Sequence, residues 1–186
     1  MNRISTGARA RAWIALFTLA ALAGCGKPPM EDAIQKNDRA AVRDTIAKGA
    51  DVNEKTSSGD TPLMAAAKNG QSSSAQALIE GGADIQTRDD AGNGVLHYAA
   101  RSGMTGICAL LIDRGIPVGD QGQGGATALH FAVQARRQET AKLLVRRGAS
   151  LDAKDDRGVS PFEFVMKSGD ERFANDLKFA ATTRAN

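Results

Sequence analysis

A segment that recurs at a fixed interval of 33 residues constrains the fold of this chain more than any other feature. Its clearest copy begins at Thr127 and reads TALHFAVQARRQETAKLLVRRGAS. Related copies begin at Thr61, Gly94 and Ser160, and a degraded fifth copy covers residues 31–60. A constant period of this length predicts stacked supersecondary units that bury their apolar faces against one another.

Two short motifs define each copy: Thr-Pro-Leu-x-x-Ala-Ala-x-x-Gly at its start and Leu-Leu-x-x-Gly-Ala-Asp near its end. This pattern closely resembles the ankyrin repeat, from about Glu31 to Phe179. The resemblance implies an all-α solenoid of five helix-turn-helix repeats with turn loops projecting along one edge. The predicted repeat domain covers 31–186, with an N-terminal cap repeat at 31–60, central repeats at 61–93, 94–126 and 127–159, and a C-terminal cap repeat at 160–186.

Local chemistry predicts two helices in each repeat. In the second copy Thr61 suits an N-cap, and Pro62 suits the first helical position, where a missing N–H costs nothing. Gly70 supplies the left-handed conformation that ends this helix, and a second helix is predicted over about Ser72–Glu80. The fourth copy has Arg136 where the second has Gly70, which predicts a non-glycine residue with positive φ.

Residues 1–24 have the pattern of a secretory signal peptide. The segment is basic, with Arg3, Arg9 and Arg11 and no acidic residue. The apolar run Trp13–Ala23 is shorter than the about 20 residues that span a bilayer.

The leader ends in Leu22-Ala23-Gly24-Cys25, which resembles the bacterial lipoprotein box. The resemblance implies that Cys25 is acylated and becomes the first residue of the mature protein, with 25–30 as lipidated cysteine and short tether. Gly26, in place of aspartate, implies by the same resemblance the periplasmic side of the outer membrane. The alternative is an ordinary signal peptide with a coincidental cysteine.

The net charge does not indicate a nucleic-acid partner. The chain has 24 basic and 21 acidic side chains, a formal charge of +3. Removing Arg3, Arg9 and Arg11 with the leader leaves 21 of each, so the mature protein is formally neutral. The excess of basic residues therefore lies in the leader and does not indicate a surface that binds polyanions.

Histidine and cysteine do not form a metal-binding pattern. His97 and His130 occupy one position in adjacent repeats, and two ligands are fewer than zinc sites use. The ankyrin resemblance implies instead that these histidines bond locally and to the adjacent loop. Cys108 stands where other copies have alanine and is interpreted as a small apolar filler. We expect no metal and no cofactor.

Paired carboxylates at Asp89-Asp90 and Asp155-Asp156 do not suggest catalysis. They lie two repeats apart, roughly 20 Å, whereas glycosidase carboxylates need about 5–10 Å. They are better interpreted as turn residues. The sequence has no nucleophile elbow, phosphate loop or dinucleotide fingerprint, so the chain is predicted not to be an enzyme.

The candidate binding residues are carried over from the ankyrin family, in which turn tips and the ends of first helices usually meet partners. These positions are Ser57, Ser58, Asp60, Lys68, Asn69, Asp90, Asn93, Arg101, Gln123, Gln134, Asp156 and Arg157. Arg101 is the first choice, because arginine is enriched in binding hot spots. A basic concentration from Arg136 to Arg147 is either a solvated helix face or a docking patch for an acidic partner or lipid head groups.

The predicted function is non-enzymatic binding of a protein partner by a monomer anchored to the membrane through its N-terminal lipid. Two uses fit: neutralising a toxin in the periplasm, as an immunity protein does, or supporting an envelope enzyme such as a periplasmic catalase in oxidative-stress defence. Both require an extended concave binding surface, which solenoids provide.

Overall fold

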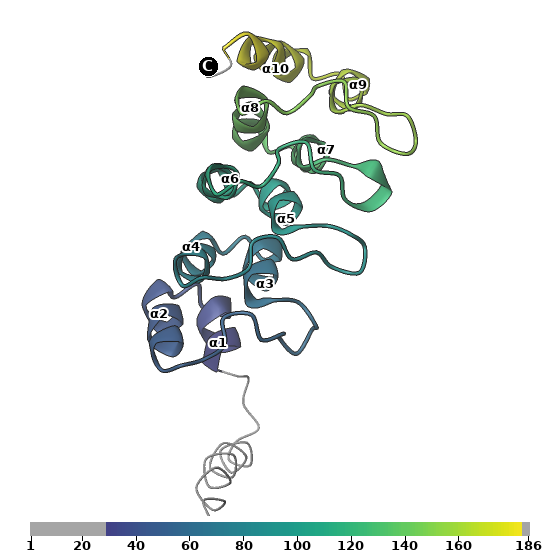
Figure 1. Cartoon of the computed structure of the whole chain (residues 1–186). Helices are drawn as coiled ribbons and strands as arrows, with labels where there is room; N and C mark the ends of the chain where they lie inside the picture. Colours follow the sequence, from purple (N-terminus) through teal and green to yellow (C-terminus); the bar gives the residue numbers. More distant parts are fainter. Residues whose placement is uncertain (1–28, 184–186) are drawn as a thin grey trace, which may run out of the picture.

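The computed structural model describes residues 29–183, which form five helical hairpins (Figure 1). The predicted signal peptide and Cys25 lie outside these residues. The hairpins are formed by α1 (Pro29–Gln35) and α2 (Arg39–Ala47), α3 (Pro62–Lys68) and α4 (Ser72–Glu80), α5 (Val95–Ser102) and α6 (Thr105–Asp113), α7 (Ala128–Gln134) and α8 (Gln138–Arg146), and α9 (Pro161–Lys167) and α10 (Glu171–Thr182). A 3₁₀ turn, η2 (Gln123–Gly125), lies in the loop before α7.

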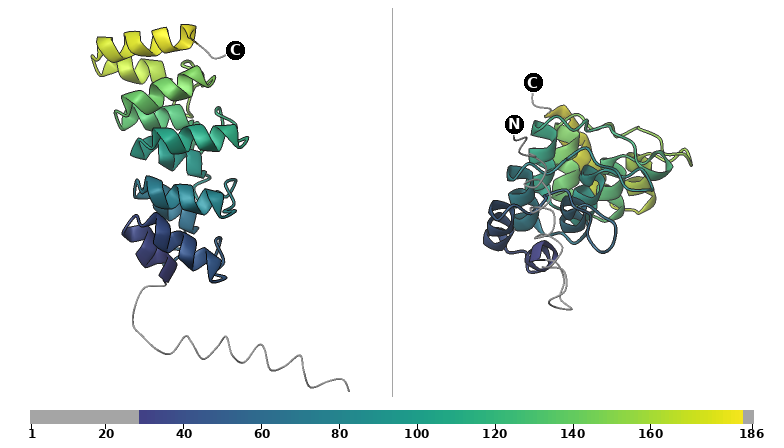
Figure 2. Two further views of the ribbon diagram at one scale, coloured as in Figure 1. Left: turned by 90° about the vertical axis from the view of Figure 1, so that its left-hand side faces the viewer. Right: turned by 60° about the horizontal axis from the view of Figure 1, so that its bottom comes forward.

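The hairpins stack into a solenoid. The first helices α1, α3, α5, α7 and α9 form an inner column, and the second helices form an outer column beside it (Figures 1 and 2). Each hairpin packs against the hairpins next to it, and the connecting loops project together on the side of the inner column. This arrangement confirms the predicted all-α repeat fold. Across residues 29–183, no helix has both the length and the apolar character needed to cross a membrane.

The predicted helix boundaries of the second repeat are confirmed. Thr61 caps α3, where its Oγ1 accepts a hydrogen bond of 3.3 Å from the backbone N–H of Met64. Gly70 follows α3 with φ of 71°, and Arg136 takes φ of 55° at the equivalent position after α7. The chain therefore reverses in the same way between the two helices of both repeats, with or without glycine.

Leucines at equivalent positions of successive repeats form part of the buried core in both helical columns. Leu63, Leu96 and Leu129 on the inner helices, like Leu144 on an outer helix, are at most 2% exposed. Alanines next to the inner leucines are fully buried as well, which lets successive helices approach closely. Cys108 is buried in the same core, and burial raises the pKa of its thiol to about 12, so its prediction as an apolar filler is confirmed.

The predicted boundary between tether and repeat domain was misplaced. The segment 25–30 was predicted to be lipidated cysteine and tether, but Pro29 and Met30 belong to α1. Met30 is buried, because its side chain packs into the first repeat. Proline is tolerated in the first turn of a helix, so Pro29 can begin α1.

Candidate protein-binding surface

Two of the loops are held by aspartates that accept hydrogen bonds from the backbone of their own turns. Asp89 Oδ1 accepts from the N–H of Asn93 at 2.9 Å and of Ala91 at 3.1 Å. Asp155 Oδ1 makes the equivalent pair with Val159 at 2.9 Å and Arg157 at 3.0 Å. These bonds confirm the turn role of Asp89 and Asp155, the first carboxylate of each pair, while Asp90 and Asp156 are exposed.

The two histidines connect the inner helices α5 and α7 to the loops that follow them. The backbone N–H of Gly94 donates to His97 Nδ1 at 3.1 Å, and His97 Nε2 donates to the carbonyl of Asp120 at 3.1 Å. His130 repeats the arrangement, accepting from Thr127 N at 3.0 Å and donating to the Val159 carbonyl at 3.1 Å. Their structural role is therefore confirmed. No group of three His, Cys, Asp or Glu within residues 29–183 could hold a metal ion.

Because His97 and His130 are buried, we expect the free energy of unfolding to depend on pH. Burial lowers the pKa of both His97 and His130 below its ordinary value. Below about pH 6.5 the unfolded chain therefore takes up protons that the folded chain does not. We expect the free energy of unfolding to be unaffected by the histidines above about pH 7.5. It should fall toward pH 5.5 by up to about 1.4 kcal/mol per pH unit for each histidine.

Urea unfolding between pH 7.5 and 5.5 measures this dependence. His97→Gln removes one titrating ring, so its stability should vary less steeply with pH than that of the parent. A parent stability that stays constant over this range would contradict the neutral, buried state of both rings.

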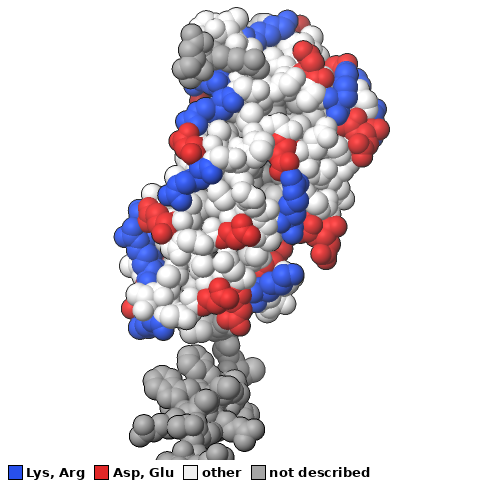
Figure 3. Space-filling model, in the orientation of Figure 1, with Lys and Arg blue, Asp and Glu red and all other residues white. Residues whose placement is uncertain are grey.

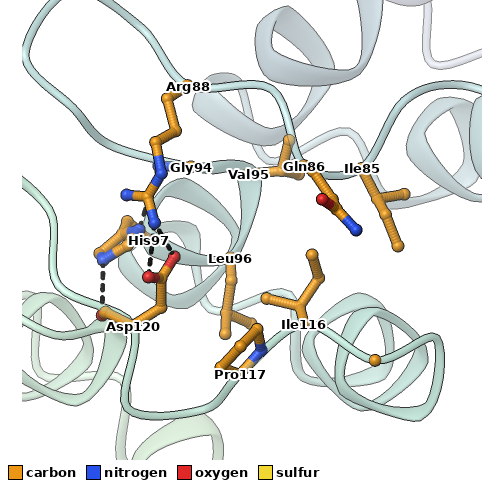
Figure 4. A pocket seen from close by; sticks show the side chains of 11 residues that line it. Ile85, Gln86, Arg88, Gly94, Val95, Leu96, His97, Ile116, Pro117 and Asp120 are labelled. Atoms are coloured by element: carbon orange, nitrogen blue, oxygen red, sulfur yellow. Dashed lines mark hydrogen bonds and ion pairs between the residues drawn. The ribbon is translucent and has the colours of Figure 1, made fainter.

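The hollow in Figure 4 connects successive loops through groups that satisfy one another. Arg88 pairs with the carboxylate of Asp120 and also donates to the Gln121 carbonyl at 3.0 Å. The imidazole of His97 lies beside them, and Ile116 and Pro117 form part of the wall. The residues around this hollow therefore hold successive loops together.

Most of the predicted binding residues are exposed on one surface. We call this the loop-side surface; it consists of the loop tips and the C-terminal ends of the inner helices. Asp60 is half-buried and pairs with Lys68 at 2.7 Å. The exposed positions are Ser57, Ser58, Lys68, Asn69, Asp90, Arg101, Gln123, Gln134, Asp156 and Arg157.

The prediction for Asn93 is wrong. Its side chain is only 2% exposed, and its Oδ1 accepts a hydrogen bond of 2.9 Å from the backbone N–H of Gln123 in the next loop. Its Nδ2 donates to Tyr98 Oη at 3.3 Å. Asn93 therefore joins two loops and is not available to a partner. Ser57 is also partly engaged, because its Oγ donates to Glu31 of the first repeat at 3.1 Å.

The sequence reasoning missed an aromatic position on the inner helices. Tyr98, Phe131 and Phe164 are spaced by one repeat each. Phe131 and Phe164 are half-buried, and the ammonium of Lys68 lies 4.7 Å from the Tyr98 ring centroid. The same 33-residue alignment that revealed the repeats could have shown this position.

The basic concentration from Arg136 to Arg147 divides between two surfaces. Lys142 pairs with Glu139 at 2.6 Å, and Arg147 pairs with Asp113 on the neighbouring outer helix. Arg137 instead extends to the third repeat, where its Nε donates to the Arg101 carbonyl at 3.0 Å. Figure 3 shows basic and acidic side chains interspersed over the visible face of the stack.

These features define a class of protein: a solenoid of helical hairpins that presents a variable polar surface on projecting loops and inner helices. A family model described as ankyrin repeats (3 copies) matches residues 30–121 and 91–155. The chain belongs to the ankyrin repeat family, whose members are protein-interaction modules. The hairpin of α9 and α10 lies beyond the matched residues and continues the stack. A comparison with curated proteins gave no match.

Proposed function

We propose that this protein binds a partner protein through the loop-side surface while a lipid on Cys25 anchors it at the periplasmic face of the outer membrane. One observation carries the binding proposal. Exposed polar side chains occupy equivalent positions of consecutive repeats, differ from repeat to repeat and lie outside the buried core. Arg101 and Gln134 exemplify them, since both are exposed at the ends of inner helices whose leucines and alanines form the core.

The composition of this surface favours a specific protein over a uniform polymer. The third repeat presents Asp90 and Arg101, whereas the fourth presents Gln123 and Gln134 at the corresponding places. A polymer of identical units would be matched by the same side chain in every repeat. Neutralisation of a periplasmic toxin and support of an envelope enzyme both require such a surface, and the identity of the captured protein distinguishes these uses.

The test combines Asp90→Ala with Arg101→Ala. Both residues are exposed, so helicity and the melting temperature should stay nearly unchanged. Affinity for the partner should fall by 2 kcal/mol or more, roughly thirtyfold, because truncation removes hot-spot contacts. The partner is first identified by crosslinking in intact envelopes and mass spectrometry, and binding is then measured with both purified proteins.

The matched control removes the same two charges from the outer helices. Arg146 on α8 and Glu171 on α10 are both exposed. Arg146→Ala with Glu171→Ala should leave binding intact. If this control abolishes binding while Asp90→Ala with Arg101→Ala does not, the partner uses the outer face and the proposal fails.

A further inference from the structure

Arg101 and Arg137 carry charges that no carboxylate of the described chain balances. Lys68 and Arg88, in contrast, are paired with Asp60 and Asp120. Within residues 29–183 the Arg101 side chain makes no hydrogen bond or ion pair, and the terminal nitrogens of Arg137 make none either. Two neighbouring guanidinium groups thus remain free to bind an anion.

These two arginines line one hollow on the loop-side surface. The hollow is bounded by residues of three successive repeats: Lys68, Tyr98, Arg101, Ser102 and Arg137. It therefore exists only where these repeats are stacked. Since the stack is built from buried leucines and alanines, the position of the hollow is fixed by the rigid part of the fold.

The Arg137 side chain is held in place before any ligand arrives. Its Nε bonds the Arg101 carbonyl at 3.0 Å, which anchors the guanidinium at the end of α5. Its alkyl chain lies over Gly103, where a Cβ atom would come 2.9 Å from Arg137 Cδ. Ordering a long side chain on binding normally costs conformational entropy, and these contacts reduce that cost.

The hollow suits a carboxylate. The planar guanidinium group presents paired N–H donors that match the two oxygens of a carboxylate. Lys68 adds little net charge, because its ammonium lies 2.7 Å from Asp60 and 3.8 Å from Asp89. The net attraction for an anion therefore comes from Arg101 and Arg137.

The surroundings favour a protein segment over a membrane surface. Asp90 and Asp156 are exposed at neighbouring loop tips and would repel an extended anionic sheet. A single acidic side chain on a peptide can enter the hollow while its neighbours avoid these carboxylates.

We propose that the hollow formed by Arg101, Arg137 and Tyr98 binds a carboxylate from an acidic segment of the partner protein. This inference rests on the proposed function, and it adds the chemical character of the partner and the residues that recognise it.

The test uses an acetylated, amidated hexapeptide with one glutamate among glycines and serines as the probe. Titration into ¹⁵N-labelled protein should shift the Nε–Hε signals of Arg101 and Arg137 in a saturable way. Arg101→Gln with Arg137→Gln should weaken peptide binding at least tenfold. Arg114→Gln with Arg146→Gln removes the same charge from exposed positions of the outer column and should leave the affinity unchanged.

The remaining measurements can overturn the inference. Equal losses of peptide affinity in both double variants would mean that the peptide is held by diffuse electrostatic attraction and not by the hollow. Equal or tighter binding of inorganic phosphate, or of vesicles containing phosphatidylglycerol, would assign the hollow to phosphate groups. If Arg137→Gln lowers the melting temperature, peptide binding is compared for Arg101→Gln alone. The Arg101 side chain is exposed, so this change should leave the stack intact. If the protein captured from envelopes binds but is insensitive to Arg101→Gln, this inference fails while the proposed function stands.

Discussion

Replacing Leu144 with alanine is expected to lower the free energy of unfolding by about 2–5 kcal/mol. Leu144 is fully buried in α8, which packs against α6, α7 and α10. Truncation removes apolar contacts and leaves a cavity among helices that cannot collapse completely around it. Domains have total stabilities of only about 5–15 kcal/mol, so this single change should be readily visible in urea unfolding.

The neighbouring residue provides the control. Leu143 lies in the same helix and is half-buried, so Leu143→Ala should be less costly than Leu144→Ala. If Leu143→Ala lowered the free energy of unfolding as much as Leu144→Ala or more, the face of α8 that is buried would be assigned wrongly.

The position of Leu144 in the stack also predicts which part of the fold loosens first. In a solenoid each repeat is stabilised by its neighbours, and within residues 29–183 the hairpin of α9 and α10 packs against the hairpin of α7 and α8 alone. Amide hydrogen exchange in Leu144→Ala should therefore increase most in α8, α9 and α10. Uniform acceleration over all repeats would indicate that the stack unfolds as one unit.

Most of the fold could be predicted from the sequence because its determinants are local and repeated. Thr61 and Pro62 specify the start of α3, and Gly70 specifies its end, so the same signals in several copies reinforce one another. Arg136 could be assigned a positive φ for the same reason, since the register of the repeats fixes the backbone that it must adopt. Such features require no knowledge of how one repeat meets the next.

The candidate surface was less predictable where a side chain contacts the adjacent repeat. The sequence placed Asn93 on an exposed turn, but the neighbouring loop approaches closely enough for Gln123 to bond its side chain. It also grouped Arg137 with the basic residues of α8, although the Arg137 side chain extends to the carbonyl of Arg101. Both outcomes depend on loop packing and on a side-chain rotamer, neither of which the period of the sequence specifies.

Cys25→Ser is expected to abolish acylation and to leave the protein either released from the membrane or with its leader attached. The proposed anchor depends on one sulfur atom, because the cysteine after Leu22-Ala23-Gly24 is the residue that the lipoprotein box would acylate. Each buried methylene of an acyl chain contributes about 0.8 kcal/mol, so several chains on one cysteine make anchoring stable. Their loss should leave the protein soluble or with its leader attached. Metabolic labelling with an alkynyl fatty acid, followed by membrane fractionation, measures both effects.

The second cysteine makes this experiment specific. Cys108 is fully buried, and its thiol pKa is raised to about 12, so it should be neither acylated nor accessible in the folded protein. Cys108→Ser should therefore retain full labelling and the same membrane fraction as the parent. Separation of inner and outer membranes then tests the sorting expected from Gly26. Parent protein that is removed from membranes by high salt or carbonate would show that attachment is peripheral and would exclude the lipid anchor.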